Sequence, residues 1–221
     1  MPVQLAAGVE GQKLEWVRSP QQVRSQQTLE RLLDAAESLL IQKGFDNTTV
    51  ADIARAAGSS VGAFYARFGD KENLLRCVFE RFAREAEATV DAALKTERWN
   101  GVPFYIVLRE AMRFMVAVFR DRHNLIAMFA IRSARDEHTY AFGQRVGEVI
   151  VERTAALIRD RGERIGHSDP TRAVRFCVWT VLAALESRAL HGAGDERWFS
   201  DEQVAYELTT MCLSYLQMER D

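Results

Sequence analysis

The residues best suited to chemistry lie between Thr49 and Lys71, where small side chains are mixed with hydroxyl groups and cations. Four consecutive small residues, 60–63, would let a helix backbone approach a partner closely. Hydroxyl groups and cations around them suit the phosphate oxygens of a nucleic acid. The pattern therefore predicts a DNA contact surface. Its candidate residues are Thr49, Ser60, Val61, Gly62, Ala63, Tyr65, Arg67 and Lys71.

Two short helices that meet at a glycine would position these side chains. Thr49, followed three residues later by Asp52, has the pattern of a helix N-cap. Gly58 supplies the positive φ of a tight turn, and a second short helix is predicted over 60–68. A helix-turn-helix places the start of its second helix against base edges in the major groove. The small residues Ala54 and Gly58 alone would equally fit a helical corner that serves only packing.

The stretch 49–75, together with a helix predicted over 28–44, resembles the DNA-binding domain of the tetracycline-repressor (TetR) family. The matching features are Gly44-Phe45, Ile53-Ala54 with Ala57-Gly58, Ser60-x-Gly62-x-x-Tyr65-x-x-Phe68 and Lys71-x-x-Leu74-Leu75. Two residues depart from the family pattern. Ser59 stands where valine is common, and Arg67 stands where histidine or another aromatic residue is common. The departure at Arg67 leaves the operator sequence open.

The resemblance implies a homodimeric transcriptional regulator, usually a repressor that binds a palindromic operator. A small effector in the C-terminal domain would release the DNA. Carried over by position, the DNA contacts implied are Thr49, Ser60, Val61, Gly62, Ala63, Tyr65 and Lys71. An alternative is a helical adaptor or ligand-binding protein that has lost DNA binding.

The chain as a whole is predicted to be all-α, with about nine helices, because apolar residues recur at spacings of three and four. We predict a mobile N-terminal arm over 1–24, a helix-turn-helix DNA-binding domain over 25–72, and a ligand-binding and dimerisation domain over 73–221. Two long helices, over 169–190 and 200–218, lie where the family pairs its subunits. The first has a face of mostly small residues suited either to close approach of a partner or to its own core: Ala173, Cys177, Thr180, Ala184 and Ser187.

Methionine and aromatic residues gather in the predicted C-terminal domain. Flexible methionines and flat rings suit a pocket for an apolar or aromatic effector, although each residue also suits a core. The pocket candidates are Phe104, Met112, Met115, Phe119, Met128, Phe129 and Trp179. Arg113, Arg132 and Glu186 interrupt apolar surroundings, where they would hold a polar group of the ligand or form ion pairs.

Composition and motifs argue against other functions. The 221 residues carry 29 Lys and Arg against 31 Asp and Glu, so net charge gives no sign of a nucleic-acid binder, and the contacts must be local. The histidines and three cysteines lack metal-ligand spacing, and dinucleotide, P-loop and serine-elbow motifs do not occur. No apolar run has the length of a membrane helix, and the N-terminus lacks a signal-peptide pattern. We expect a cytoplasmic protein that is not an enzyme and needs no cofactor or metal.

Overall fold

A computed structural model of the protein describes residues 23–191 and 199–218. Within these ranges it contains nine α-helices and no strand, which confirms the predicted all-α fold. None of these helices is both long and apolar enough to cross a membrane. The helices are α1 (Val23–Lys43), α2 (Val50–Ala56), α3 (Val61–Phe68), α4 (Lys71–Ala93), α5 (Phe104–Asp121), α6 (His123–Ser133), α7 (Glu137–Asp160), α8 (Pro170–His191) and α9 (Asp201–Leu216), with a short 3-10 helix, η1 (Thr96–Trp99).

The described chain forms two compact units. The first unit comprises residues 23–85 and 124–143, and the second comprises residues 86–123, 144–191 and 199–218. The first unit therefore combines α1, α2, α3 and the start of α4 with most of α6 and the first turns of α7. The domain boundaries predicted at residues 24 and 72 remain a prediction.

Helix α1 begins at Val23, about one turn earlier than the apolar pattern predicts. No glycine or proline lies between Val23 and Lys43, so nothing in the sequence ends the helix before Thr28. The last two residues of the predicted arm are therefore helical, while residues 1–22 lie outside the described ranges. Gly44 ends the helix with a φ of 75°, the left-handed cap that the sequence predicts.

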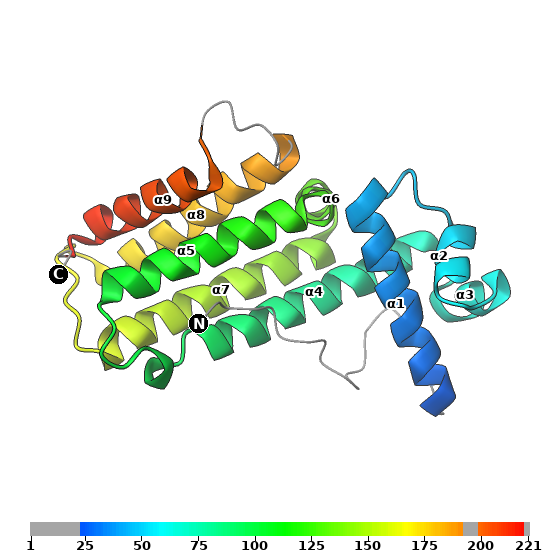
Figure 1. Ribbon diagram of the computed structural model, residues 1–221, viewed down its shortest axis with the longest axis horizontal. Helices are drawn as coiled ribbons and strands as arrows, with labels where there is room; N and C mark the ends of the chain where they lie inside the picture. Colours follow the sequence, from blue (N-terminus) through cyan, green and yellow to red (C-terminus); the bar gives the residue numbers. More distant parts are fainter. Residues whose placement is uncertain (1–22, 192–198, 219–221) are drawn as a thin grey trace. The chain divides into compact units, whose positions relative to one another are not determined.

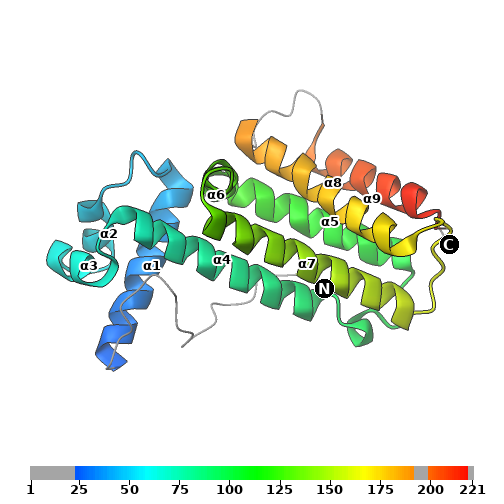
Figure 2. The ribbon, with the colours of Figure 1, turned by 180° about the vertical axis from the view of Figure 1, so that it is seen from behind.

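The first unit is built around apolar residues from its short helices. Figures 1 and 2 show α1 beside α2 and α3. Ile53 of α2 and Phe64 of α3 are fully buried and anchor the two helices in the core. Leucines of α1 and of α4 complete this core: Leu29, Leu32, Leu33, Leu40, Leu74 and Leu75. Burial of these side chains fixes the angle at which α2 and α3 meet.

Residues from α6 and α7 also belong to the first unit. The Asn124 amide donates to the Ile41 carbonyl oxygen at 2.7 Å, and the Phe79 and Phe129 rings meet edge to face with centroids 5.1 Å apart. The break between α6 and α7 is not predicted from the sequence. Asp136 makes it by accepting hydrogen bonds from the backbone N–H and the hydroxyl of Thr139, at 2.9 and 2.6 Å, which caps α7.

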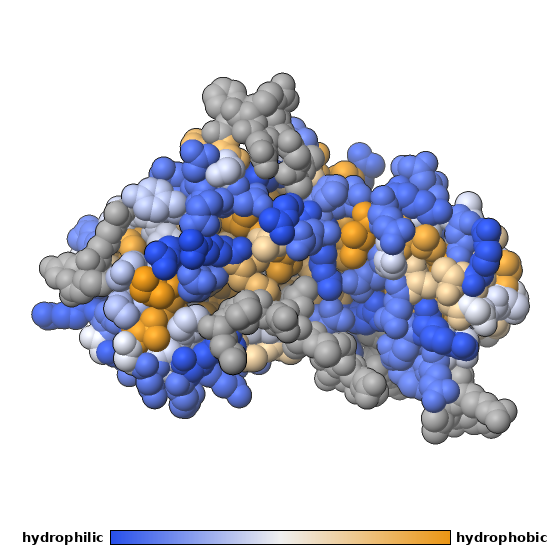
Figure 3. All heavy atoms as spheres, viewed as in Figure 1, coloured by the Kyte–Doolittle hydropathy of each residue, from blue (hydrophilic) through white to orange (hydrophobic). Residues whose placement is uncertain are grey.

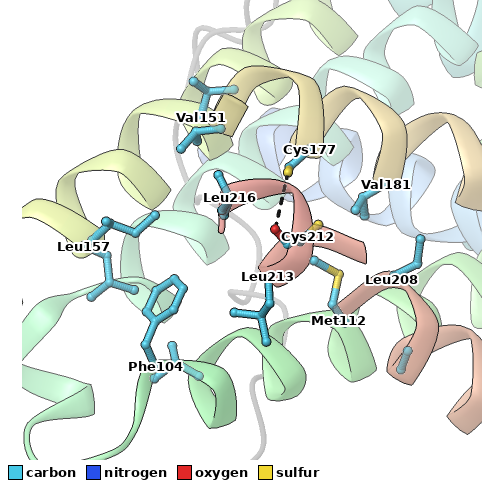
Figure 4. Packing of buried hydrophobic residues seen from close by; sticks show 14 of the residues in the cluster. Phe104, Met112, Val151, Leu157, Cys177, Val181, Leu208, Cys212, Leu213 and Leu216 are labelled. Carbon is cyan, nitrogen blue, oxygen red and sulfur yellow. Dashed lines mark hydrogen bonds between the residues drawn. The ribbon is translucent and has the colours of Figure 1, made fainter. Parts of the chain in front are cut away.

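The second unit packs α5, α7, α8 and α9 along one another (Figures 1 and 2). Their facing sides bury a single apolar cluster, part of which Figure 4 shows from close by. Cys177 of α8 and Cys212 of α9 face each other there, with the Cys177 Sγ 4.0 Å from the Cys212 carbonyl oxygen. All three cysteines are buried free thiols, as expected of residues that serve a core.

Candidate nucleic-acid interface

Helix α2 starts at the capping box that the sequence predicts. The Thr49 hydroxyl oxygen accepts a hydrogen bond from the Asp52 N–H at 3.1 Å. In return, the Asp52 carboxylate accepts from the Thr49 N–H at 3.2 Å and from the Thr49 hydroxyl at 2.8 Å. Thr49 is exposed, so its hydroxyl lies at the protein surface next to the unpaired N–H groups of a helix N-terminus. Such a position favours an anion.

Asp52 forms ion pairs with two basic side chains near this end of α2. Its carboxylate pairs with Lys43 at 3.2 Å and also with Arg55. The side-chain and backbone hydrogen bonds from Thr49, followed by the hydrogen bond from Lys43, lower the pKa of Asp52 to about 2. The carboxylate is therefore ionised at neutral pH and offsets both basic groups.

The turn between α2 and α3 is built as the sequence predicts. Gly58 has a φ of 59°, which only glycine adopts without strain. The Ser59 N–H donates to the Ala54 carbonyl oxygen at 2.8 Å and closes the end of α2. Ala54 and Ala57 are buried, and their small size lets the helices cross closely. Ser59 is half-buried without the valine of the common pattern, so the turn tolerates this departure.

Helix α3 presents its first turn outward. Ser60 is its N-cap and accepts a hydrogen bond from the Ala63 N–H at 3.0 Å. Val61 is 42% exposed and Tyr65 is 51% exposed, while Gly62 is exposed and meets little around it. In Figure 3 hydrophobic and weakly hydrophobic residues lie among hydrophilic ones in the region of α2 and α3. A capped helix with a small, exposed first turn can approach a flat or grooved partner closely.

The two predicted cations are less exposed than these residues. Arg67 is half-buried, and burial lowers its pKa. Burial also lowers the pKa of Lys71, whose ammonium donates to the Phe45 carbonyl oxygen at 2.5 Å and lies 3.8 Å from the centre of the Phe45 ring. Arg132 lies 4.5 Å from the centre of the same ring. Thr49, Tyr65 and residues 60–62 are thus exposed and Ala63 is half-buried, whereas Lys71 is held against Phe45.

The predicted ligand-pocket residues do not form one group. Phe104 and Met112 of α5 are buried in the second unit, with Met115 and Phe119 partly buried against the same cluster. Met128 and Phe129 lie in the first unit, where both are partly buried and the Phe129 ring meets Phe79. Trp179 is 64% exposed on α8. Periodicity marks each residue as apolar but does not tell which unit it joins.

The three charged residues singled out within apolar surroundings have distinct environments. Arg113 pairs with Glu110 at 2.9 Å and also with Glu202, and Arg132 pairs with Glu72 at 2.5 Å. Arg113 and Arg132 thus form ion pairs. Burial raises the pKa of Glu186. No group of three or more metal-ligating side chains occurs in the described part of the chain.

Comparisons with known proteins identify the family. The model of "Bacterial regulatory proteins, tetR family" matches residues 32–78, and that of "Tetracyclin repressor-like, C-terminal domain" matches residues 104–216. The chain is 42% identical over 60 residues to the uncharacterized HTH-type transcriptional regulator YwcC of Bacillus subtilis, which covers 27% of each chain. It is 26% identical over 180 residues to the A-factor receptor protein of Streptomyces griseus, which covers 80% of this chain and 60% of that protein.

A solved structure shows the same fold. The crystal structure of a TetR-family regulator from Mesorhizobium loti aligns with a TM-score of 0.72 at 21% identity, over 89% of this chain and 98% of that chain. The chain spans less than two thirds of the length of the two curated relatives named above. The C-terminal family model nevertheless covers more than half of the chain, and the N-terminal model covers the helix-turn-helix. The protein therefore belongs to the tetR family of bacterial regulatory proteins, which are helix-turn-helix transcriptional regulators.

Proposed function

We propose that the protein is a homodimeric repressor that binds a palindromic DNA operator and leaves it when a small effector binds. The observation that carries this proposal is the capped and exposed first turn of α3, which follows a helix-turn-helix built around Gly58. The small, exposed residues of this turn leave room for base edges. The proposal makes the protein a regulator and not an enzyme, acting in the cytoplasm.

The contacts divide by chemistry. Ser60, Val61, Gly62 and Ala63 start the recognition helix and approach base edges. Thr49 and Tyr65 donate hydroxyl groups to phosphates, which positions the protein without reading sequence. Arg67 and Lys71 supply positive charge at the far end of α3 and the start of α4. Both side chains are half-buried. A phosphate would therefore either replace the Phe45 carbonyl oxygen as the partner of Lys71 or bind beside that contact.

The second copy of the chain binds on α8 and α9. Phe176 is 46% exposed and Trp179 is 64% exposed, and their rings lie 5.9 Å apart. Tyr215 of α9 packs against Phe176 at 5.0 Å. Exposed aromatic groups of this kind are typical interface anchors. A two-fold dimer would place two recognition helices in successive major grooves, about 34 to 36 Å apart.

The small-residue face predicted on α8 contributes only in part. Ala173 and Cys177 are buried within the subunit, whereas Ala184 and Ser187 are exposed. The buried residues recur every four positions, at 173, 177, 181, 185 and 189. The predicted face instead alternates spacings of four and three residues. Along the helix it therefore separates from the line of buried residues. Its C-terminal half is therefore exposed, but Ala184 and Ser187 lie about 140° and 80° around the helix from Trp179.

The effector is a small apolar or aromatic molecule held among the helices of the second unit. Met115 and Phe119 of α5 are partly buried against its core, where rearrangement of flexible side chains would admit a ligand. The Streptomyces relative, whose match covers 80% of this chain, is named a receptor. That name supports a small effector for this protein. Coupling of about 1 to 3 kcal/mol between effector and DNA would suffice for release.

Fluorescence anisotropy with the full chain tests the proposed function. The probe is duplex DNA from immediately upstream of its own gene, titrated with and without excess random DNA at two salt concentrations. Saturable binding that resists competition, by a dimer, is the expected result. Selection from random duplexes then separates a distant operator from a true loss of DNA binding. Failure of both experiments would favour the helical adaptor.

A further inference from the structure

Most basic groups around the helix-turn-helix are already engaged by the protein. Lys43 and Arg55 share the Asp52 carboxylate, and Lys71 is held by the Phe45 carbonyl oxygen and ring. Residues 12–72 contain as many acidic as basic side chains, eight of each. A cation that no carboxylate offsets would add directly to the attraction for a polyanion.

Arg31 is such a cation. It is exposed on α1, and it forms no ion pair with any residue of the ranges 23–191 and 199–218. Its guanidinium has one weak contact within those ranges, a hydrogen bond to the Thr28 hydroxyl at 3.4 Å. The nearest acidic residue on the same face, Asp34, already pairs with Arg81 at 2.6 Å. The charge of Arg31 is thus available to a ligand.

The guanidinium of Arg31 lies beside the turn of the helix-turn-helix. Its Nη1 is 4.0 Å from the place that a Cβ would occupy at Gly58, two residues before the N-cap of α3. A groove of about 430 Å³ opens here between α1 and α2, with Arg31, Ser38 and Gln42 on one wall and Ala56 and Ala57 on the other. The small residues on the α2 wall leave space in front of the guanidinium.

Helix α2 separates Thr49 from Arg31. Its seven residues give a length of about 10 Å, and the major groove of B-DNA is about 12 Å wide. Thr49 lies at the start of α2, and Arg31 lies beside the turn at its other end. Thr49 and Arg31 are therefore far enough apart to contact different phosphates.

From this placement we propose that Arg31 binds a DNA backbone phosphate beside the α2–α3 turn, a different phosphate from the one contacted at Thr49. The proposal rests on the proposed DNA-binding function and adds a site to it. A guanidinium donates two parallel hydrogen bonds to phosphate oxygens, which fixes the protein's orientation as well as its affinity. Because a phosphate carries no sequence information, Arg31 stabilises specific and random complexes alike.

The test compares the full-length protein with its Arg31→Ala and Arg31→Lys variants on operator and random duplexes at three salt concentrations. Arg31→Ala should weaken binding about tenfold on both duplexes and reduce the slope of log K against log salt by about 1. Arg31→Lys keeps the positive charge but loses the two parallel hydrogen-bond donors of the guanidinium. This variant should therefore retain the wild-type salt slope and bind more tightly than Arg31→Ala, but less tightly than the wild type. Arg159→Ala on α7 removes an exposed charge elsewhere and should change neither quantity.

A second measurement locates the phosphate. Ethylation of single phosphates should interfere with wild-type binding at each contacted phosphate, and the interference at the phosphate beside the α2–α3 turn should disappear for Arg31→Ala. Wild-type DNA binding together with an unchanged slope in a folded Arg31→Ala variant would overturn the site and leave the proposed function intact. A wild-type protein that binds no duplex, including selected ones, would overturn the proposed function and this site with it. Thermal unfolding of each variant shows whether the fold is retained.

Discussion

The ammonium of Lys71 donates a hydrogen bond of 2.5 Å to the carbonyl oxygen of Phe45 and lies over the ring of the same residue, 3.8 Å from its centre. Lys71 is the first residue of α4, where the helix dipole disfavours a cation. The carbonyl dipole and the ring offset this cost. The contact also ties the start of α4 to the connection between α1 and α2, which carries Thr49.

Lys71→Ala should therefore affect stability as well as DNA binding. Loss of the hydrogen bond and of the cation–π contact should lower the free energy of unfolding by about 1 kcal/mol. Urea unfolding measures this change, and Lys95→Ala, at an exposed lysine of the second unit, is the control. If Lys71 also reaches a phosphate, as proposed, the salt slope of binding falls by about 1. An unchanged slope would leave Lys71 with a structural role only.

Asp52→Asn should destabilise the protein in a pH-dependent way. The pKa of Asp52 is about 2 in the folded state, compared with 3.8 for an aspartate without these partners. Ionised Asp52 therefore stabilises the fold above pH 3.8. This contribution is lost as the pH falls from 3.8 toward 2. We expect the stability gap between wild type and variant to be wide at pH 6 and narrower at pH 3.

Urea titrations at several pH values measure the gap for Asp52→Asn. Asp46→Asn is the matched control, because Asp46 is an exposed aspartate of the same unit. A gap that is as wide at pH 3 as at pH 6 would mean that Asp52 does not act through its charge.

Gly62→Glu should remove DNA binding and keep the fold. A Cβ at position 62 would meet only the Ser60 hydroxyl, at 3.8 Å, so a side chain fits on the protein side. On the DNA side it would bring bulk and negative charge against the duplex, and we expect at least about 100-fold weaker binding.

Gly62→Ala is a companion variant that changes the helix propensity of position 62 but adds only one methyl group. Alanine favours a helix by about 1 kcal/mol over glycine, so this variant should unfold at a slightly higher temperature. Circular dichroism follows the melting of both variants, and anisotropy follows binding. A Gly62→Glu protein that fails to fold would make Gly62 a packing residue instead of a contact.

Much of this arrangement is predictable from the sequence because local chemistry determines it. The capping box at Thr49, the positive φ of Gly58 and the buried anchors Ile53 and Phe64 each follow from residue type and spacing. Such features depend on contacts within a few residues. The helix-turn-helix and the all-α fold were accordingly predicted correctly.

Features set by distant contacts were not predictable. Met128 and Phe129 have the same apolar character as Met112, but they join a different unit because Phe129 meets Phe79 of α4. The residues next to Trp179 in the sequence do not indicate that its side chain is exposed. The contact of Lys71 with Phe45 crosses 26 positions, so the sequence shows the cation but not its acceptor. The α7 cap is a local feature, because Asp136 and Thr139 are three residues apart, and its pattern indicates a helix start at this point.

Trp179→Glu should convert the proposed dimer to a monomer. A buried charge in an aromatic interface opposes association, and loss of a tryptophan anchor weakens binding by about 2 to 4 kcal/mol. Size-exclusion chromatography with light scattering gives the mass at several concentrations. Tyr140→Glu, at a residue 52% exposed in the first unit, is the control for a charge placed on an exposed aromatic position. A Trp179→Glu protein that stays dimeric would move the interface away from this part of α8.

Tyr65→Phe should weaken DNA binding without changing the fold. Tyr65 is 51% exposed on α3, and removal of one hydroxyl leaves its ring against Phe64, with centroids 5.4 Å apart. Loss of the hydroxyl hydrogen bond to a phosphate anion should reduce affinity about tenfold or more on operator and random DNA alike. Because no charge is removed, the salt slope should stay the same, in contrast to Lys71→Ala. A loss confined to the operator would show instead that the Tyr65 hydroxyl contacts a base edge.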